Sequence, residues 1–121
     1  MLPIGILHEH PEWFKPLFAE LERRGLPYER LDATRLVFDP SDPEPHHSLL
    51  VNRMSPSAWT RGNERAIFQT LHYLAYLDRI GARVLNGVRA YELELSKARQ
   101  ASLLAELGIA YPRMRVFSDP G

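Results

Sequence analysis

Short apolar runs alternate along this chain with longer segments in which apolar residues recur every three or four positions. Short runs that are bounded by polar turns are typical of buried strands. Such runs lie at residues 4–7, 28–31, 48–51 and 83–85. A further apolar segment at residues 111–117, entered by Pro112, resembles a fifth strand.

Pro11 and Gly25 bound the first predicted helix. It begins at Pro11, tolerates Pro16 because that residue lies near the helix start, and ends before Gly25. Its apolar stripe is formed by Phe14, Leu17, Phe18 and Leu21. The spacing of this stripe predicts one buried helix face.

A longer helix is predicted at residues 64–80, where Gly81 ends it. The apolar residues of its broad buried face are Ile67, Leu71, Leu74 and Ala75, with Phe68, Tyr73, Tyr76 and Leu77 beside them. A short helix follows at residues 88–95. Ser96 is predicted to cap the next helix, whose inner face carries Ala101, Leu104 and Leu107.

This alternation of strands and helices predicts an α/β fold with a Rossmann-like open parallel sheet of four to five strands and helices on both faces. Hydrophobic residues make up 45% of the chain, which is enough for the core of one domain at residues 1–117. The proline-rich segment 39–45 is predicted to be a surface loop. Residues 118–121 are predicted to form a turn at the start of a linker.

Charge and cysteine content narrow the classes of function. Fifteen Lys and Arg residues balance fifteen Asp and Glu residues, so no general attraction to nucleic acid or membranes is expected. No apolar run approaches the roughly 20 residues of a membrane span. The absence of cysteine removes thiol chemistry and fits a reducing cytoplasm, where we expect the protein to lie.

Polar residues follow three of the predicted strands. They are His8-Glu9-His10, Asn52-Arg53-Met54-Ser55 and Asn86-Gly87. Ligands of open parallel sheets bind beyond the carboxyl ends of the strands, so these segments are candidates for a binding site. The alternative is that the loops are polar because they are solvated.

Two chemical hypotheses concern the carboxyl edge of the predicted sheet, one based on Arg53 and one on His8. The planar guanidinium of Arg53 suits a carboxylate or phosphate ligand, and the alternative is a salt bridge to an acid such as Glu9 or Glu12. His8 and His10 have the spacing of two metal ligands in an extended segment, but no third ligand is evident. Surface or capping histidines are the alternative, and no metal site is predicted.

Two nucleotide-binding motifs are missing. No Gly-x-Gly-x-x-Gly follows the first strand, and no Gly-x-x-x-x-Gly-Lys-Ser/Thr occurs in the chain. A response-regulator receiver would need a phosphoacceptor Asp at the end of its third strand, where this chain has Asn52-Arg53. These absences argue against dinucleotide binding, a phosphate loop and a receiver domain.

In order and spacing, three segments resemble the amino-terminal domain of ATP-grasp ligases, most closely the RimK-type glutamate ligase branch. The segments are Val51-Asn52-Arg53, the strand and turn GARVLNGVRA at 81–90, and SKARQASLLAELGIAYP at 96–112. In that family an Arg loop is followed by a helix, a "G-x-x-V-x-N" strand, a "D/S-K" helix start and "G-I-x-x-P". The resemblance covers most of residues 1–117.

The resemblance implies a carboxylate–amine ligase that uses ATP and Mg²⁺ to form an acyl phosphate. Arg53 and Asn86 match positions on the substrate side of the cleft, and with His8 they are the candidate substrate-binding residues. Lys97 matches the family's lysine near the nucleotide phosphates; its alternative is a solvated first-turn lysine. The family often has Asp at the position of Ser96.

The expected partners are a small carboxylate or peptide substrate and ATP-grasp domains of the same polypeptide beyond Gly121. Without those domains we expect no catalysis and no tight ATP binding, and self-association through the exposed face is plausible. The alternative function is a stand-alone Rossmann-like module that binds a ligand or a protein. A small metal-dependent enzyme that uses His8 and His10 is the third hypothesis.

Overall fold

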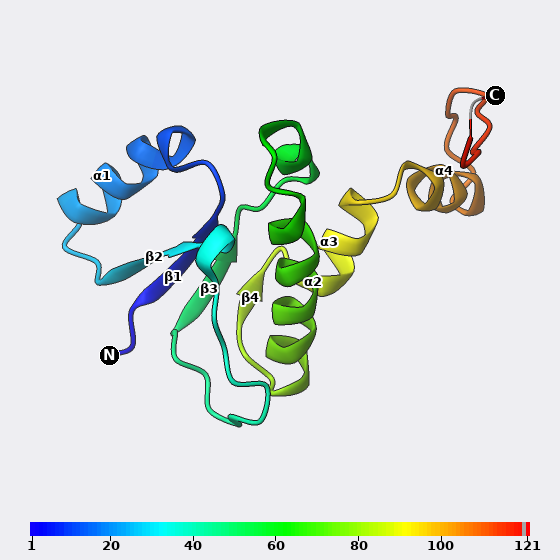
Figure 1. The fold of residues 1–121 in the computed structure, drawn as a ribbon. Coiled ribbons are helices and arrows are strands. Elements are labelled where there is room, and N and C mark those ends of the chain that lie inside the picture. The colour runs from blue at the N-terminus through cyan, green and yellow to red at the C-terminus, as the bar shows by residue number, and fades with distance from the viewer. Residues whose placement is uncertain (120) are drawn as a thin grey trace.

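A four-stranded, all-parallel sheet forms the centre of the computed structural model, which describes residues 1–119 and 121 (Figure 1). The strands are β1 (Ile4–His8), β2 (Tyr28–Asp32), β3 (Leu49–Asn52) and β4 (Val84–Leu85), in the spatial order β2-β1-β3-β4. Ile4 pairs with Tyr28 on one side and with Leu49 on the other. The predicted α/β fold with an open parallel sheet is confirmed.

Side chains of successive strand residues point to opposite faces of the sheet. Both faces therefore present apolar side chains, and helices cover both. Ile6 and Val51 pack against α1 (Lys15–Arg23), which follows the short 3-10 helix η1 (Pro11–Phe14). Leu7 and Leu50 belong to the second core cluster, together with residues of α2 (Glu64–Arg79). A 3-10 helix, η3 (Pro56–Arg61), lies between β3 and α2.

The first helical segment follows its sequence signals closely. Phe14, Phe18 and Leu21 are buried and form one core cluster with Ile6. Pro16 lies in the first turn of α1, where the missing N–H leaves no intrahelical bond unmade. Gly25 follows the helix with φ +63°, a backbone conformation that favours glycine.

The buried face of α2 is rotated from the predicted one. Its buried residues are Ala66, Thr70, Tyr73, Leu74, Tyr76 and Leu77. Phe68 is 64% exposed and Ala75 is exposed, so their assignment to the core was wrong. The small residues Thr70 and Ala66 occupy the inner positions one and two turns before Tyr73, respectively, and they allow close packing. No helix in the described part of the chain has the length and apolar character needed to cross a membrane.

The connection from β2 to β3 crosses the sheet without an α-helix. It contains a 3-10 turn, η2 (Ala33–Arg35), and then the predicted proline-rich loop. Side chains of α2 hold this loop: the Tyr76 hydroxyl donates to the Asp42 carbonyl over 2.9 Å, and Arg79 donates to the Pro40 carbonyl over 2.7 Å. The loop therefore lies where a doubly wound fold usually has a crossover helix.

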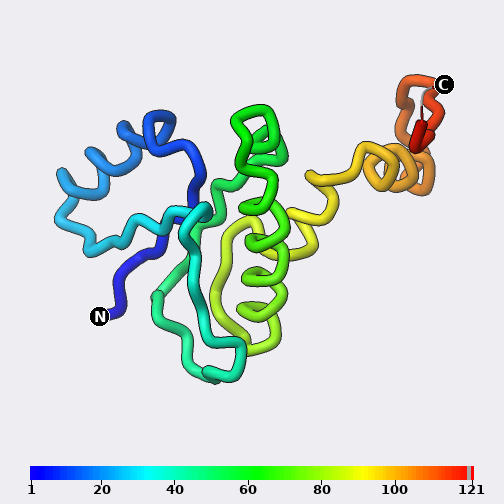
Figure 2. Tube along the Cα trace, viewed as in Figure 1, coloured from blue at the N-terminus to red at the C-terminus, as the bar shows by residue number. Residues whose placement is uncertain are grey.

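At the carboxyl end of the chain the predicted helices form, but they pack differently. α3 (Val88–Glu94) packs on α2 through the fully buried Tyr91, and Ser96 caps α4 (Lys97–Glu106) by accepting from the Arg99 N–H over 3.1 Å. α4 has no buried residue and extends away from the sheet beyond α3 (Figures 1 and 2). The predicted inner face of α4 was wrong at Leu107, which is 61% exposed, whereas Ala101 and Leu104 are half-buried.

The predicted fifth strand at residues 111–117 is also wrong. This segment has no regular secondary structure, and all its residues are exposed. It follows α4, which carries it away from β4, so no sheet edge is within reach of its backbone. The predicted turn at 118–121 includes Pro120, which lies outside the described residues.

Candidate functional site

The carboxyl edge of the sheet brings together the three polar segments that the sequence singled out. His8 pairs in register with Asp32, and Leu7 pairs with Asn52. The Arg53 N–H donates to the Leu7 carbonyl over 2.8 Å, which extends the β1–β3 ladder by one bond. The connections from β1 and β3 leave toward opposite faces, so the topological switch point lies between them.

Arg53 presents its guanidinium to solvent at this switch point. The group lies over the Phe14 ring, 5.5 Å from the ring centroid. Among the described residues no carboxylate lies at ion-pair distance from it: Glu9 pairs with Arg61, and Glu12 pairs with Lys15 over 2.6 Å. The salt bridge that the sequence left open for Arg53 is therefore not formed with either acid.

Glu9 forms an ion pair that sequence reasoning did not find. The Arg61 Nε atom lies 2.9 Å from both Glu9 carboxylate oxygens, and Arg61 Nη2 lies 2.6 Å from Glu9 Oε2. Asn63 donates to Glu9 Oε1 over 2.6 Å. Hydrogen bonding from Arg61 holds the pKa of Glu9 below its usual value, against the opposing effect of burial. The pair ties the end of β1 to the segment that leads into α2.

An aromatic platform borders this ion pair. The Trp13 ring stacks on His10 with centroids 4.3 Å apart, and the Arg61 guanidinium lies 4.8 Å from the Trp13 centroid. Trp13 itself is exposed. His10 and Arg61 already lie against the Trp13 ring, so the accessible group at this edge is the Arg53 guanidinium, which suits a ligand with an anionic group.

His8 lies inside the protein, on the α1 side of the sheet. It is 4% exposed, and its ring lies 6.1 Å from the Phe14 ring and 5.6 Å from the Phe18 ring. Neither ring nitrogen has a hydrogen-bond partner among the described residues. Burial lowers the pKa of His8 below 6.5; Asp32 and Glu9 oppose this shift, and Arg30 adds to it. Its predicted role in substrate binding stays a prediction.

Acidification should destabilise the fold through His8. Because its folded-state pKa lies below the unfolded value, its contribution to stability is present above pH 6.5 and is lost as the pH falls toward the lowered pKa. We expect the variant His8→Leu to lose less stability than the unmodified protein between about pH 7 and 5. Urea unfolding at each pH measures this difference.

The exposed His72 supplies the control for that comparison. His72→Gln should keep the pH dependence of the unmodified protein. An unchanged pH dependence in His8→Leu would contradict the assignment of the effect to His8.

Asn86 follows β4 and links its carboxyl end to that of β3. Its φ of 60° is in the left-handed region, which asparagine tolerates better than most residues. The Asn52 amide donates to the Asn86 carbonyl over 3.0 Å, and the Asn86 amide donates to the Asn52 carbonyl over 3.4 Å. Asn52 also accepts from the Met54 N–H over 3.0 Å. These bonds hold the two strand ends together beside Arg53.

Lys97 lies apart from the other candidate residues. It is in the first turn of α4, and its ammonium donates to Gln100 Oε1 over 3.3 Å. A shallow pocket of about 380 Å³ lies beside it, lined also by Gln100, Ala101, Leu104, Tyr111, Pro112 and Met114. α4 projects beyond α3, away from the carboxyl edge of the sheet (Figure 1). The structure thus brings His8, Arg53 and Asn86 to one edge and places Lys97 elsewhere.

The histidines and carboxylates of the described residues are not gathered into a metal centre. Among the described residues, no group of three or more His, Asp or Glu side chains is arranged to hold a metal ion. His10 stacks on Trp13, while His8 is buried against Phe14 and Phe18. The two histidines are therefore held by separate aromatic contacts.

No known protein family and no curated protein matches this chain. The fold, the geometry of the carboxyl edge and the polar segments after β1, β3 and β4 are the features of this chain that bear on its function. Among these, the accessible Arg53 at the switch point is the feature with the most direct chemical meaning.

Proposed function

We propose that this chain is the amino-terminal, substrate-facing domain of an ATP-dependent carboxylate–amine ligase of the ATP-grasp type. The observation that carries the proposal is Arg53: its guanidinium is exposed at the switch point and lacks a carboxylate partner among the described residues. A planar, unneutralised guanidinium at this position is suited to hold the carboxylate of a small acid or peptide.

The local contacts support this role for Arg53. Its guanidinium is supported by the Phe14 ring, and the nearby Arg61 is already neutralised by Glu9. Asn86 and Asn52 fix the neighbouring strand ends through reciprocal hydrogen bonds. An incoming carboxylate would therefore pair with Arg53 and would compete with no internal acid.

In such a ligase, ATP with Mg²⁺ supplies the phosphoryl group that converts the carboxylate into an acyl phosphate. This chain would orient the carboxylate through Arg53, so that one oxygen stays free to accept that group. Lys97 is the residue proposed to reach the nucleotide phosphates. We propose that the chain's own contribution is substrate positioning and that it has no activity without the domains that bind ATP.

Packing against ATP-grasp domains would cover the apolar surface at the carboxyl end of the chain. The exposed apolar residues of this surface are Leu103, Leu107, Ile109, Tyr111, Met114, Val116 and Phe117. Exposed apolar surface of this kind favours association with another domain, or with a second copy of the chain. Lys97 begins the helix that carries part of this surface, which would bring it near the domain that binds ATP.

Arg53→Gln tests the proposal in the protein that carries this chain together with its ATP-grasp domains. The assay follows ADP formation with ATP, Mg²⁺ and a panel of amino acids and short peptides. We expect the variant to raise KM for the carboxylate substrate about tenfold or more, because a charge-assisted pair is lost, and to leave KM for ATP unchanged.

Arg83→Gln is the matched control, because Arg83 is exposed at the opposite, amino end of β4. It should leave both KM values unchanged. Absence of carboxylate-dependent ADP formation would overturn the ligase proposal. Carboxylate binding through Arg53 without any ATP turnover would instead favour the stand-alone binding module.

A further inference from the structure

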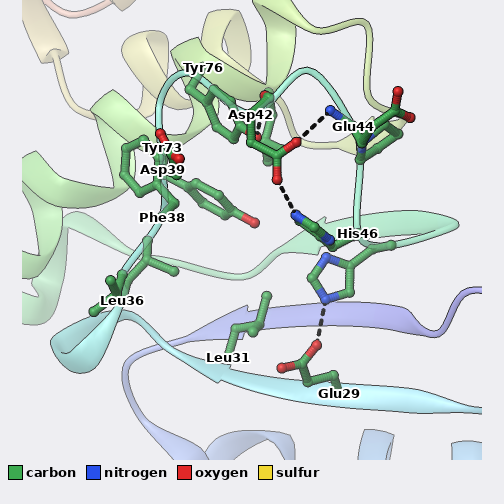
Figure 3. Close-up of a pocket in the computed structure, with 14 residues that line it drawn as sticks. Glu29, Leu31, Leu36, Phe38, Asp39, Asp42, Glu44, His46, Tyr73 and Tyr76 are labelled. Carbon is green, nitrogen blue, oxygen red and sulfur yellow. Dashed lines mark hydrogen bonds and ion pairs between the residues drawn. The ribbon is translucent and has the colours of Figure 1, made fainter.

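A second cavity lies under the proline-rich loop, on the α2 side of β2. Its volume is about 380 Å³, and its walls come from β2, the segment 36–47 and the second half of α2. The cavity exists because the β2–β3 connection lacks a crossover helix, whose side chains would otherwise fill this space. Figure 3 shows the side chains that surround it.

Three aromatic rings form one wall of this cavity. The Phe38 ring centroid lies 5.1 Å from that of Tyr73 and 5.2 Å from that of Tyr76. Tyr76 is fixed by its hydrogen bond to the Asp42 carbonyl. A preformed aromatic wall of this kind binds apolar groups and also attracts cations to the ring faces.

The charged groups around the cavity are carboxylates. They belong to Glu29, Asp39, Asp42 and Glu44. Among the described residues no Lys or Arg lines the cavity, and the nearby Arg79 guanidinium lies 5.9 Å from the centroid of the Tyr76 ring. Asp42 lies 2.8 Å from His46, and Glu29 lies 2.7 Å from His47. Glu44 has no side-chain partner among the described residues. The cavity therefore favours a positively charged ligand over an anionic one.

Tyr73 provides a polar group inside the cavity that has no internal role. The residue is 6% exposed, and its ring points from α2 into the cavity (Figure 3). Its hydroxyl makes no hydrogen bond with the described residues, although Tyr76 and Tyr91 both bond to backbone carbonyls. Burial raises the pKa of Tyr73 to about 12, so the phenol stays neutral. The hydroxyl oxygen is accessible from the cavity, so it is free to bond to a ligand there.

We propose that this cavity binds a small organic ammonium ion that has an apolar body. The Tyr73 oxygen accepts from the ammonium, the rings of Phe38 and Tyr76 contact the apolar body, and the surrounding carboxylates balance the charge. Arg53 does not line this cavity, so the site is separate from the carboxyl edge and independent of the proposed ligase function.

Three probes of similar size and different charge test the site: phenethylammonium, 2-phenylethanol and 3-phenylpropionate. Titrations are followed by amide chemical shifts at about pH 8, where an amine is protonated and an imidazole generally is not. We expect the ammonium to bind with a Kd of about 1 mM or tighter and to shift the amides of 36–47 and 73–77. The alcohol should bind at least about threefold more weakly, and the carboxylate weaker still.

Tyr73→Phe removes only the unpartnered hydroxyl, so the fold should be kept. It should weaken binding of phenethylammonium about tenfold. Tyr111→Phe, in the exposed segment after α4, is the matched control and should leave the Kd unchanged. Equal affinity for the ammonium and the alcohol, no shifts in 36–47, or an unchanged Kd in Tyr73→Phe would each overturn the proposal.

Discussion

Replacing Glu9 by alanine should lower the free energy of unfolding by about 3 kcal/mol. Glu9 is 9% exposed, and its carboxylate accepts from both Arg61 and Asn63. The variant would leave the Arg61 guanidinium and the Asn63 amide without their acceptor at the end of β1. Because Arg61 is partly exposed, water can hydrate its guanidinium in the variant. The expected loss of stability is therefore at the lower end of the range for breaking a buried ion pair.

Urea unfolding near neutral pH measures this loss, and Glu12→Ala provides the control. Glu12 makes an exposed ion pair with Lys15, so its removal should change stability by no more than about 0.5 kcal/mol. The pKa of Glu9 is lowered in the folded state, so its contribution is present above the usual value of 4.5 and is lost as the pH falls through the lowered pKa. A Glu9→Ala effect as small as that of Glu12→Ala would contradict the importance of the pair.

Replacing Gly5 by alanine should lower the free energy of unfolding by about 2 kcal/mol. A Cβ atom at Gly5 would lie 2.8 Å from His47 Cδ2 and 2.8 Å from Leu50 Cδ1, closer than carbon atoms can approach. The position is in the centre of β1, between β2 and β3, so the backbone cannot move away without disturbing both ladders. The His47 side chain would have to move from its place over β1, which would break its contact with Glu29.

Gly87→Ala is the control for this effect. A Cβ atom there would meet only Val84, at 3.9 Å, and the φ of −70° is open to any residue. Thermal and urea unfolding of the two variants should therefore differ clearly. Equal stabilities would show that the His47 side chain moves aside easily, contrary to its packed position over β1.

The strands and the first helix could be predicted because their signals are local. Apolar runs between polar turns marked β1 to β4 within one or two residues, and Pro11 and Gly25 bounded the first helical segment. The face of α2 was harder to predict, because Ala66 and Thr70 are buried for their small size and not for their hydrophobicity. The segment 111–117 has strand-like composition, but pairing depends on an edge within reach, which sequence does not show.

The candidate site could be predicted only in part, for similar reasons. Parallel topology alone brought the segments after β1, β3 and β4 to one edge. The partners within that edge depend on contacts between distant residues: Glu9 lies 52 positions before Arg61. The cavity lined by Tyr73 was not predicted, because it arises from the path of a loop and has no motif of its own.

The helix-free connection between β2 and β3 has a consequence for local unfolding. A crossover helix is stabilised by its own backbone ladder, whereas the segment 36–47 is held by separate side-chain anchors, including Tyr76, Arg79 and His47. Such anchors can break without opening any bond of the sheet. Amide hydrogens of this segment should therefore exchange with solvent faster than those of β1 and β3, and its transient opening gives the space beneath it a route to solvent.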